Sequence, residues 1–185
     1  MMVEKSERSP QVGGDFELTD HFGRCITSAD YRGRFALIYF GFTHCKLVCP
    51  RALARISGAL DRLGSSAAAV QPLYITVDPE RDSPAALRAF LEERFPHFVG
   101  LTGSREEVDA VKSTYRVFAR KVANPADPDG YDVPHSALTY LLDTQGNYRA
   151  HYPDTVDEET LAERLRVEIA KDAPPAARRD LEWRS

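Results

Sequence analysis

Two cysteine residues stand four positions apart in the sequence FGFTHCKLVCP, which occupies residues 40–50. Across about one helical turn, the sulfur atoms of Cys45 and Cys49 can face each other closely enough to form one disulfide or to bind one metal ion. Free cysteines are also among the residues most often buried in protein cores. The pair is therefore a disulfide switch, a metal site or ordinary core.

The elements predicted on either side of the pair favour chemistry over a structural role. Residues 35–42 form a nearly continuous apolar and aromatic run, which predicts a central strand covered on both faces. After Pro50, apolar residues recur every three or four positions up to Leu63, so a helix is predicted there. Cys45 and Cys49 then lie at the helix N-terminus, where unpaired amides and the helix dipole lower the pKa of a thiol from about 8.5.

Two thiolates alone rarely complete a metal site, so a third ligand is expected from another loop at the same edge of the sheet. The segment Tyr131-Asp-Val-Pro-His135 supplies the candidate. His135 follows a polar loop and opens the predicted strand at residues 136–142. A single histidine at the start of a strand is more often a surface or turn residue, but the position of His135 in the chain after the two cysteines favours a ligand role.

Several other residues carry weaker predictions. Asp78 ends a second buried strand near the same sheet edge, where it can influence the site or partner docking, or can serve as a turn and capping residue. His44 points away from Cys45 if the extended geometry continues, so a structural role is expected. Cys25 falls in a predicted hairpin and is expected to be a free or buried thiol. The remaining histidines are expected on the surface or in turns: His21, His97 and His151.

The alternation of apolar patterns predicts the fold class. The predicted elements are a hairpin near residues 16–26, a strand at 35–42, a helix at 50–63, a strand at 72–77, a helix capped by Ser83, a short strand at 98–101, a helix with a capping box of Ser104 and Glu107, a loop at 123–133, a hairpin of 137–142 and 148–152, and a last helix through 161–169. This order indicates an α/β protein with a thioredoxin-like fold, in which helices flank a mixed central sheet and an N-terminal β-hairpin extends it.

Length and charge limit the classes of function. One folded domain is expected at residues 14–171, between flexible tails at 1–13 and 172–185. With 24 basic and 28 acidic residues the net charge is -4, so no nucleic-acid partner is expected. The longest apolar run is far shorter than the roughly 20 residues that cross a bilayer. The N-terminus lacks a signal-peptide pattern, so the protein is expected to be cytoplasmic or to have lost a native export segment or membrane anchor.

Three segments together resemble the Sco/SenC family, which comprises thioredoxin-like copper proteins involved in cytochrome c oxidase assembly. They are residues 40–50 with the Cys-x-x-x-Cys-Pro pattern, Ile75-Thr-Val-Asp-Pro-Glu-Arg-Asp82, and His135-Ser136 leading into residues 139–143. The resemblance runs from about Gly14 to about Ile169. It implies that Cys45, Cys49 and His135 are ligands of copper, as Cu(I) or Cu(II).

The same resemblance implies the partner and the location. The expected partner is the copper-receiving subunit of cytochrome c oxidase or another copper chaperone. The expected location is periplasmic, or anchored to a membrane and facing the periplasm, or the mitochondrial intermembrane space. Soft thiolates select Cu(I), and an added imidazole lets a site accept Cu(II) as well, so the residue types agree with this ion.

Two departures from the family pattern keep a second function open. Lys46 and Leu47 stand between the cysteines where the family usually has a proline and an acidic residue, and a cation there favours thiolates while repelling a metal. Pro134 replaces an acidic residue and resembles the cis-proline that faces the cysteines of thiol–disulfide oxidoreductases. The alternative function is therefore a thiol–disulfide oxidoreductase, in which Cys45 attacks and Cys49 resolves.

Overall fold

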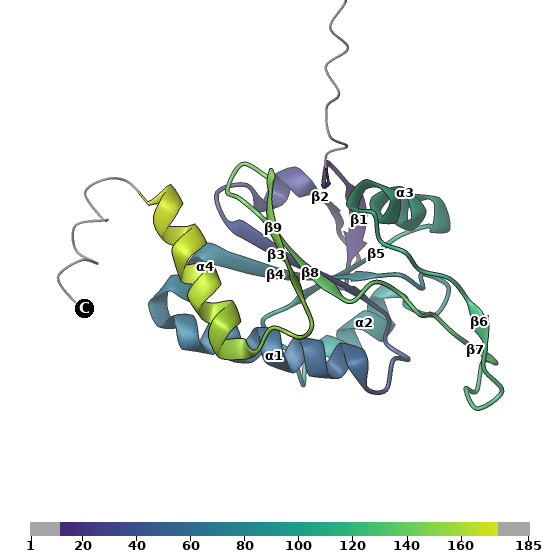
Figure 1. The fold of residues 1–185 in the computed structure, drawn as a ribbon. Helices are drawn as coiled ribbons and strands as arrows, with labels where there is room; N and C mark the ends of the chain where they lie inside the picture. Colours follow the sequence, from purple (N-terminus) through teal and green to yellow (C-terminus); the bar gives the residue numbers. More distant parts are fainter. Residues whose placement is uncertain (1–11, 174–185) are drawn as a thin grey trace, which may run out of the picture.

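The computed structural model describes residues 12–173, which form a mixed β-sheet with helices on both faces (Figure 1). Seven strands are hydrogen-bonded in the order β2-β1-β5-β4-β3-β8-β9. Their bounds are β1 Glu17–Asp20, β2 Cys25–Thr27, β3 Phe35–Gly41, β4 Val70–Thr76, β5 Val99–Thr102, β8 Leu138–Leu142 and β9 Tyr148–Pro153. β3 runs parallel to β4 and antiparallel to β8, so the predicted mixed sheet is confirmed. β1 and β2 form the predicted N-terminal hairpin.

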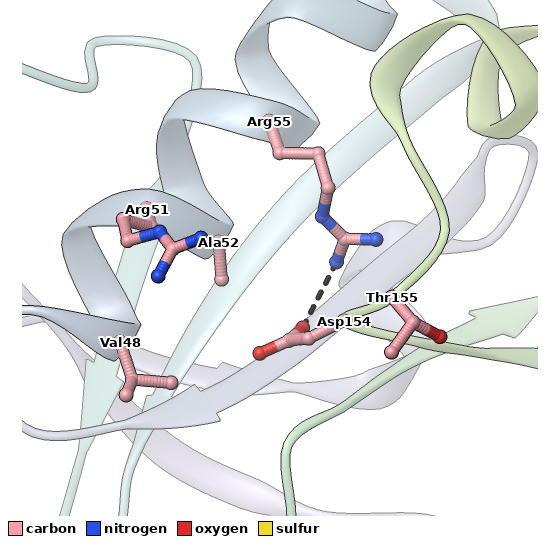
Figure 2. Close-up of a pocket in the computed structure, with 6 residues that line it drawn as sticks. All are labelled: Val48, Arg51, Ala52, Arg55, Asp154 and Thr155. Atoms are coloured by element: carbon pink, nitrogen blue, oxygen red, sulfur yellow. Dashed lines mark hydrogen bonds and ion pairs between the residues drawn. The ribbon is translucent and has the colours of Figure 1, made fainter.

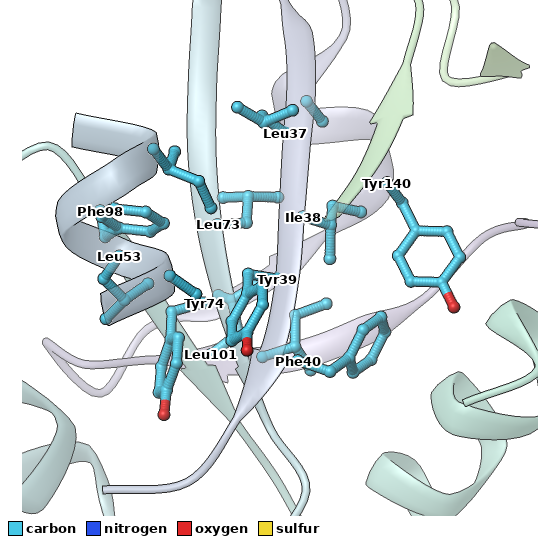
Figure 3. Close-up of a cluster of buried hydrophobic side chains, with 14 of the residues drawn as sticks. Leu37, Ile38, Tyr39, Phe40, Leu53, Leu73, Tyr74, Phe98, Leu101 and Tyr140 are labelled. Atoms are coloured by element: carbon cyan, nitrogen blue, oxygen red, sulfur yellow. The ribbon is translucent and has the colours of Figure 1, made fainter. Parts of the chain in front are cut away.

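The central strands β3 and β4 are buried along their whole length, and their side chains alternate between the two faces. Tyr39 stacks on Tyr74 (Figure 3). Tyr74 contacts Phe90 of α2 (Pro84–Leu91), whereas Phe40 contacts Tyr115 of α3 (Arg105–Tyr115) on the opposite face. Helices α1 and α4 pack against each other. The helices span α1 Val48–Leu63, α2 Pro84–Leu91, α3 Arg105–Tyr115 and α4 Glu158–Asp172.

Three helices begin at a polar side chain that accepts a hydrogen bond from the first turn. Ser83 caps α2, and Ser104 forms the predicted capping box with Glu107 at the start of α3. Asp157 caps α4 in the same way. α1 differs, because its N-cap residue Leu47 makes no side-chain capping bond. The first amides of α1 are therefore available to another acceptor.

Both ends of the predicted domain, residues 14 and 171, lie inside the described part of the chain. The predicted tails fall mostly in residues 1–11 and 174–185, which lie outside the described part of the chain. The Gly13 amide donates to the Thr114 carbonyl over 3.1 Å, so the folded region begins before residue 14. α4 continues to Asp172, one residue beyond the predicted end of the domain. No helix within residues 12–173 is long and apolar enough to cross a membrane.

One local prediction needs correction, and two others are confirmed. The predicted loop at 123–133 overlaps a two-stranded ribbon of β6 (Val122–Ala123) and β7 (Tyr131–Asp132). Cys25 is a free thiol as predicted, and it is exposed, with its sulfur 3.5 Å from a carboxylate oxygen of Glu17. His21 lies in the turn after β1, one of the two predicted settings, and it is buried, with its Nδ1 accepting a hydrogen bond from the Gly100 amide over 2.8 Å.

Candidate metal centre

Cys45 occupies the open N-terminus of α1. The Cys49 amide donates a hydrogen bond to Cys45 Sγ over 3.3 Å, so this sulfur performs the capping role that Leu47 leaves vacant. A hydrogen bond from the Cys49 thiol and the backbone amides of residues 47–49 lower the pKa of Cys45 to about 5, although partial burial opposes the shift. Cys45 is therefore a half-buried thiolate at neutral pH, as the predicted position at a helix N-terminus implies.

Cys49 lies beneath Cys45 and is fully buried. Its hydrogen bond to Cys45, burial and the charge of the Cys45 thiolate raise the pKa of Cys49. Gly41, the last residue of β3, leaves the space for this sulfur: a Cβ there would lie 2.9 Å from Cys49 Sγ and 2.6 Å from the Tyr74 hydroxyl. The two thiols thus differ in charge and in access to solvent.

The imidazole of His135 lies next to the cysteine pair. Its Nδ1 donates a hydrogen bond to the Val133 carbonyl over 3.0 Å, so the lone pair lies on Nε2. Nε2 is 4.0 Å from Cys49 Sγ. The imidazole is held edge-on to the rings of Phe42 and Tyr39, with centroids 5.8 and 6.4 Å away. The lone pair of His135 is thereby directed at the thiol pair.

Cys49 lies between the other two predicted residues and contacts each of them. Cys45 contacts Cys49, and Cys49 contacts His135. Within residues 12–173, no three His, Cys, Asp or Glu side chains lie close enough together to hold a metal ion as they stand. The donor set of two sulfurs and one imidazole nitrogen suits copper, because soft thiolates select Cu(I) and imidazole admits Cu(II).

The position of His135 relative to its strand differs from the prediction. β8 begins at Leu138, and His135 pairs instead with Ala119 in an isolated bridge three residues earlier. Pro134 does not have the predicted resemblance to a cis-proline, since no peptide bond among the described residues is cis. Lys46 is exposed next to Cys45, and it makes no ion pair within the described part of the chain.

Two residues that the sequence did not assign to the site hold its loops in place. Asp82 is buried and accepts hydrogen bonds from the amide and hydroxyl of Thr43 and from the hydroxyl of Thr76. Burial raises the pKa of Asp82 even though these hydrogen bonds oppose the shift. Arg81 forms ion pairs with Asp78 and Asp127. In the sequence, the only sign that Arg81 and Asp82 belong near the site was the resemblance of residues 75–82 to a segment of the Sco/SenC family.

The weaker candidates have structural contacts. Asp78 is buried, pairs with Arg81 and accepts a hydrogen bond from the Tyr131 hydroxyl over 3.0 Å, so it does not face the thiols directly. His44 lies 3.5 Å from a carboxylate oxygen of Asp129. His97 pairs with Asp61, and His151 contacts Tyr148.

A cleft of about 300 Å³ adjoins the site at the start of α1, lined by Val48, Arg51, Ala52, Arg55, Asp154 and Thr155 (Figure 2). Asp154 pairs with Arg55 over 3.0 Å and accepts a hydrogen bond from the Tyr39 hydroxyl over 3.3 Å. Burial raises the pKa of Asp154, against the effect of Arg55. Tyr39 links this polar cluster to His135, whose ring it contacts.

Residues 4–170 match the family model described as SCO1/SenC. The chain belongs to the SCO1/SenC family. An SCO2-like protein of Rickettsia felis is 37% identical over 146 residues, which cover 79% of this chain and 71% of that protein. The predicted family is therefore confirmed.

Solved structures of family members share the fold. The Bradyrhizobium japonicum ScoI structure with copper bound is 40% identical, has a TM-score of 0.76, and matches 84% of this chain and 98% of its own. Yeast Sco1 with copper bound is 37% identical, with a TM-score of 0.79, and matches 92% and 94% of the two chains. The predicted thioredoxin-like fold is confirmed by these neighbours.

Proposed function

We propose that this SCO1/SenC protein binds one copper ion through Cys45, Cys49 and His135 and passes it on. The observation that carries the proposal is the 4.0 Å approach of His135 Nε2, with its lone pair free, to Cys49 Sγ at the open end of α1. Copper in the ScoI and Sco1 structures supports the choice of ion. Three ligands form a low-coordinate site, from which the ion can leave by ligand exchange, whereas structural zinc prefers four closed ligands.

The proposed acceptor is the copper-receiving subunit of cytochrome c oxidase, with a second copper chaperone as the donor or an alternative acceptor. The protein delivers copper to the dinuclear centre of the oxidase or prepares the thiols of that centre. These thiols lie outside the cytoplasm, so the proposed location is the periplasmic side of a membrane or the mitochondrial intermembrane space. Phosphatase fused to the full-length protein is expected to be active if this location is correct and inactive if the fusion stays in the cytoplasm.

Anaerobic titration with Cu(I) against a competing chelator tests the site. The reduced protein is expected to bind one tight equivalent, and Cys45→Ser, Cys49→Ser and His135→Ala are each expected to lose it. Cys25→Ser and His151→Ala are matched controls, because both residues are exposed and contact other partners. Affinity that is unchanged in His135→Ala would count against the three-ligand site.

A second function is favoured by the contrast between the two thiols. The half-buried Cys45 thiolate can attack a disulfide of a partner, which forms a mixed disulfide and releases one partner thiolate. The Cys49 thiol then gives up its proton and attacks Cys45, which forms the internal disulfide and releases the second partner sulfur, so two electrons and one proton pass to the partner and water supplies the proton of its other thiol. Metal-free protein that cannot reduce a target disulfide, under conditions where dithiothreitol can, would exclude this function.

A further inference from the structure

Two loops carry the proposed ligands, and both are tied to one dipeptide. The cysteine turn, residues 42–47, contains Cys45 and leads to Cys49. The histidine loop, residues 124–135, contains β7 and ends at His135. Arg81 and Asp82 lie between β4 and α2, outside both loops.

The Asp82 carboxylate accepts hydrogen bonds from the cysteine turn and from β4. One carboxylate oxygen accepts the Thr43 hydroxyl over 2.6 Å, and the other accepts the Thr43 amide over 3.0 Å and the Thr76 hydroxyl over 2.7 Å. Since Thr76 belongs to β4, the carboxylate fixes the cysteine turn to the sheet. Asp82 is fully buried, so these hydrogen bonds do not compete with water.

Arg81 contacts the histidine loop. Its guanidinium lies 3.0 Å from Asp127 Oδ1, 3.3 Å from the Tyr131 carbonyl and 3.6 Å from Asp129 Oδ2, and it stacks 3.8 Å from the centre of the Tyr131 ring. On its other side it binds Asp78 over 2.5 Å. Only 8% of the side chain is exposed. The planar fork of arginine makes these contacts together, which a lysine ammonium cannot do.

A third contact closes the arrangement. His44, in the cysteine turn, lies 3.5 Å from Asp129 of the histidine loop, and Asp129 also faces Arg81. The guanidinium of Arg81 additionally lies 5.8 Å from the ring of Phe42, which is itself in contact with the imidazole of His135. The two loops are thus fixed to each other as well as to the Arg81–Asp82 pair.

We propose that the Arg81–Asp82 pair sets the separation between the thiols and the imidazole, with Asp82 positioning the cysteine turn and Arg81 positioning the histidine loop. This inference rests on the proposed copper site. Neither residue binds the metal; both are positioning residues that act through Thr43 and through the loop ending at His135. Outer contacts of this kind usually change metal affinity 10- to 100-fold when they are removed.

Cu(II) is used as the probe, because its binding to the site depends on the imidazole ligand more than the binding of Cu(I) does. Arg81→Lys keeps one positive charge beside Asp78 but loses the contacts to Asp127 and Tyr131. It is expected to weaken Cu(II) binding about 10- to 100-fold, measured by chelator competition, and to shift the sulfur-to-copper absorption band. Thr43→Val removes the hydroxyl donor to Asp82 and is expected to weaken binding about tenfold.

Double variants separate positioning from general loss of structure. On the weak Cu(II) binding that the two cysteines retain in a His135→Ala protein, Arg81→Lys is expected to have a smaller effect than on wild type, because it acts chiefly through the loop that ends at His135. Thr43→Val is expected to keep its full effect on that weak binding, because it acts through the cysteines. Two matched controls are expected to bind Cu(II) normally: Arg88→Lys, at an exposed ion pair with Glu92, and Thr27→Val, at an exposed hydrogen bond to Asp30.

The metal-free protein gives an independent readout. Hydrogen exchange is expected to become faster across residues 124–135 in Arg81→Lys and to stay unchanged in α4. If Arg81→Lys does not fold, Asp127→Asn tests the same contact from the side of the histidine loop, because it removes the charge that pairs with Arg81, and the same faster exchange across residues 124–135 is expected.

Two results overturn the inference, and they are distinguishable. Normal Cu(II) binding by folded Arg81→Lys and Thr43→Val proteins, with binding weakened in His135→Ala, overturns the positioning role alone. An equal loss from Arg81→Lys in the wild-type and His135→Ala backgrounds does the same. Normal binding by His135→Ala itself overturns the proposed copper site, and the positioning role with it.

Discussion

The Cys49 amide donates a hydrogen bond to Cys45 Sγ over 3.3 Å, so a thiolate takes the place of a capping side chain at α1. Serine or aspartate normally accepts the first amides of a helix, as Ser83 does in α2. Here the same amides stabilise a thiolate, which is the form that binds a soft metal or attacks a disulfide. The absence of a side-chain cap at Leu47 is therefore part of the site.

The reactivity of Cys45 is expected to report this cap directly. In reduced, metal-free protein, its rate of alkylation by iodoacetamide is expected to rise with pH around a midpoint of about 5. Cys25 is an internal control, because a hydrogen bond with Glu17 raises its pKa above 9.0. Mass spectrometry of the two peptides measures both rates in one sample. A Cys45 midpoint equal to that of Cys25 would contradict a thiolate cap.

Stability is expected to depend on pH through the same group. The folded state holds Cys45 as thiolate above about pH 5, whereas the unfolded chain keeps the thiol protonated up to its ordinary pKa of 9.0. The unfolded state therefore binds more protons in this window, and the contribution of Cys45 to the free energy of unfolding rises with pH and is lost as pH falls toward 5. Urea unfolding with a reductant at pH 6, 7 and 8 measures it. The difference between wild type and Cys45→Ser is expected to grow across this series; a constant difference would contradict the shift.

Gly41 is expected to be essential for the position of Cys49. In Gly41→Ala the new Cβ would lie 2.6 Å from the Tyr74 hydroxyl and 2.9 Å from Cys49 Sγ, so buried groups must move. Overpacking of this kind costs about 1–3 kcal/mol, which urea unfolding can measure. Gly58→Ala in α1 is the matched control, because it meets only the flexible carboxylate of Glu158 and gains helix propensity. Equal stabilities for the two variants would mean that the site is looser than the structure indicates.

Local patterns were sufficient to predict the parts of the fold that depend on nearby residues. The apolar run of β3, the proline after Cys49 and the serine caps of α2 and α3 act within one or two turns, and the structure has each of them. Convergence of His135 on the cysteines came from the resemblance and the order of elements rather than from any local pattern.

Long-range contacts explain what could not be predicted. Asp82 reaches Thr43 across 39 positions and Arg81 reaches Asp127 across 46, and nothing in the intervening sequence specifies either pair. His21 is buried because Gly100 presents a bare amide to its ring, a contact across 79 positions. The two-residue strands β6 and β7 are too short to produce an alternating pattern.

The ion pair of Arg55 and Asp154 lines the cleft beside α1 (Figure 2), and its contribution to stability can be tested. Arg55 binds Asp154, Thr139 and two backbone carbonyls, and only 11% of its side chain is exposed. Arg55→Met is expected to lower the free energy of unfolding by about 2–3 kcal/mol at pH 7, because it leaves Asp154 unpaired.

The loss from Arg55→Met is expected to shrink as pH falls toward 4. Without Arg55 the pKa of Asp154, already raised by burial, rises further, so the folded state gains a proton that the unfolded state lacks. Arg55→Met combined with Asp154→Asn is the control, and it is expected to recover part of the loss at pH 7. A loss that is independent of pH would mean that the carbonyl contacts of Arg55, rather than its charge, stabilise the cluster.

Copper binding is expected to release about one proton per Cu(I) at pH 8. Cys45 is already a thiolate, while the raised pKa of Cys49 keeps that thiol protonated until the metal replaces its proton. Anaerobic calorimetric titrations in two buffers of different ionisation enthalpy measure the number of protons released per copper ion. Cys49→Ser is expected to release about none at pH 8 with whatever copper it binds. Release of two protons at pH 8 would show that both thiols are protonated before copper arrives, and that the amides of α1 do not hold a thiolate.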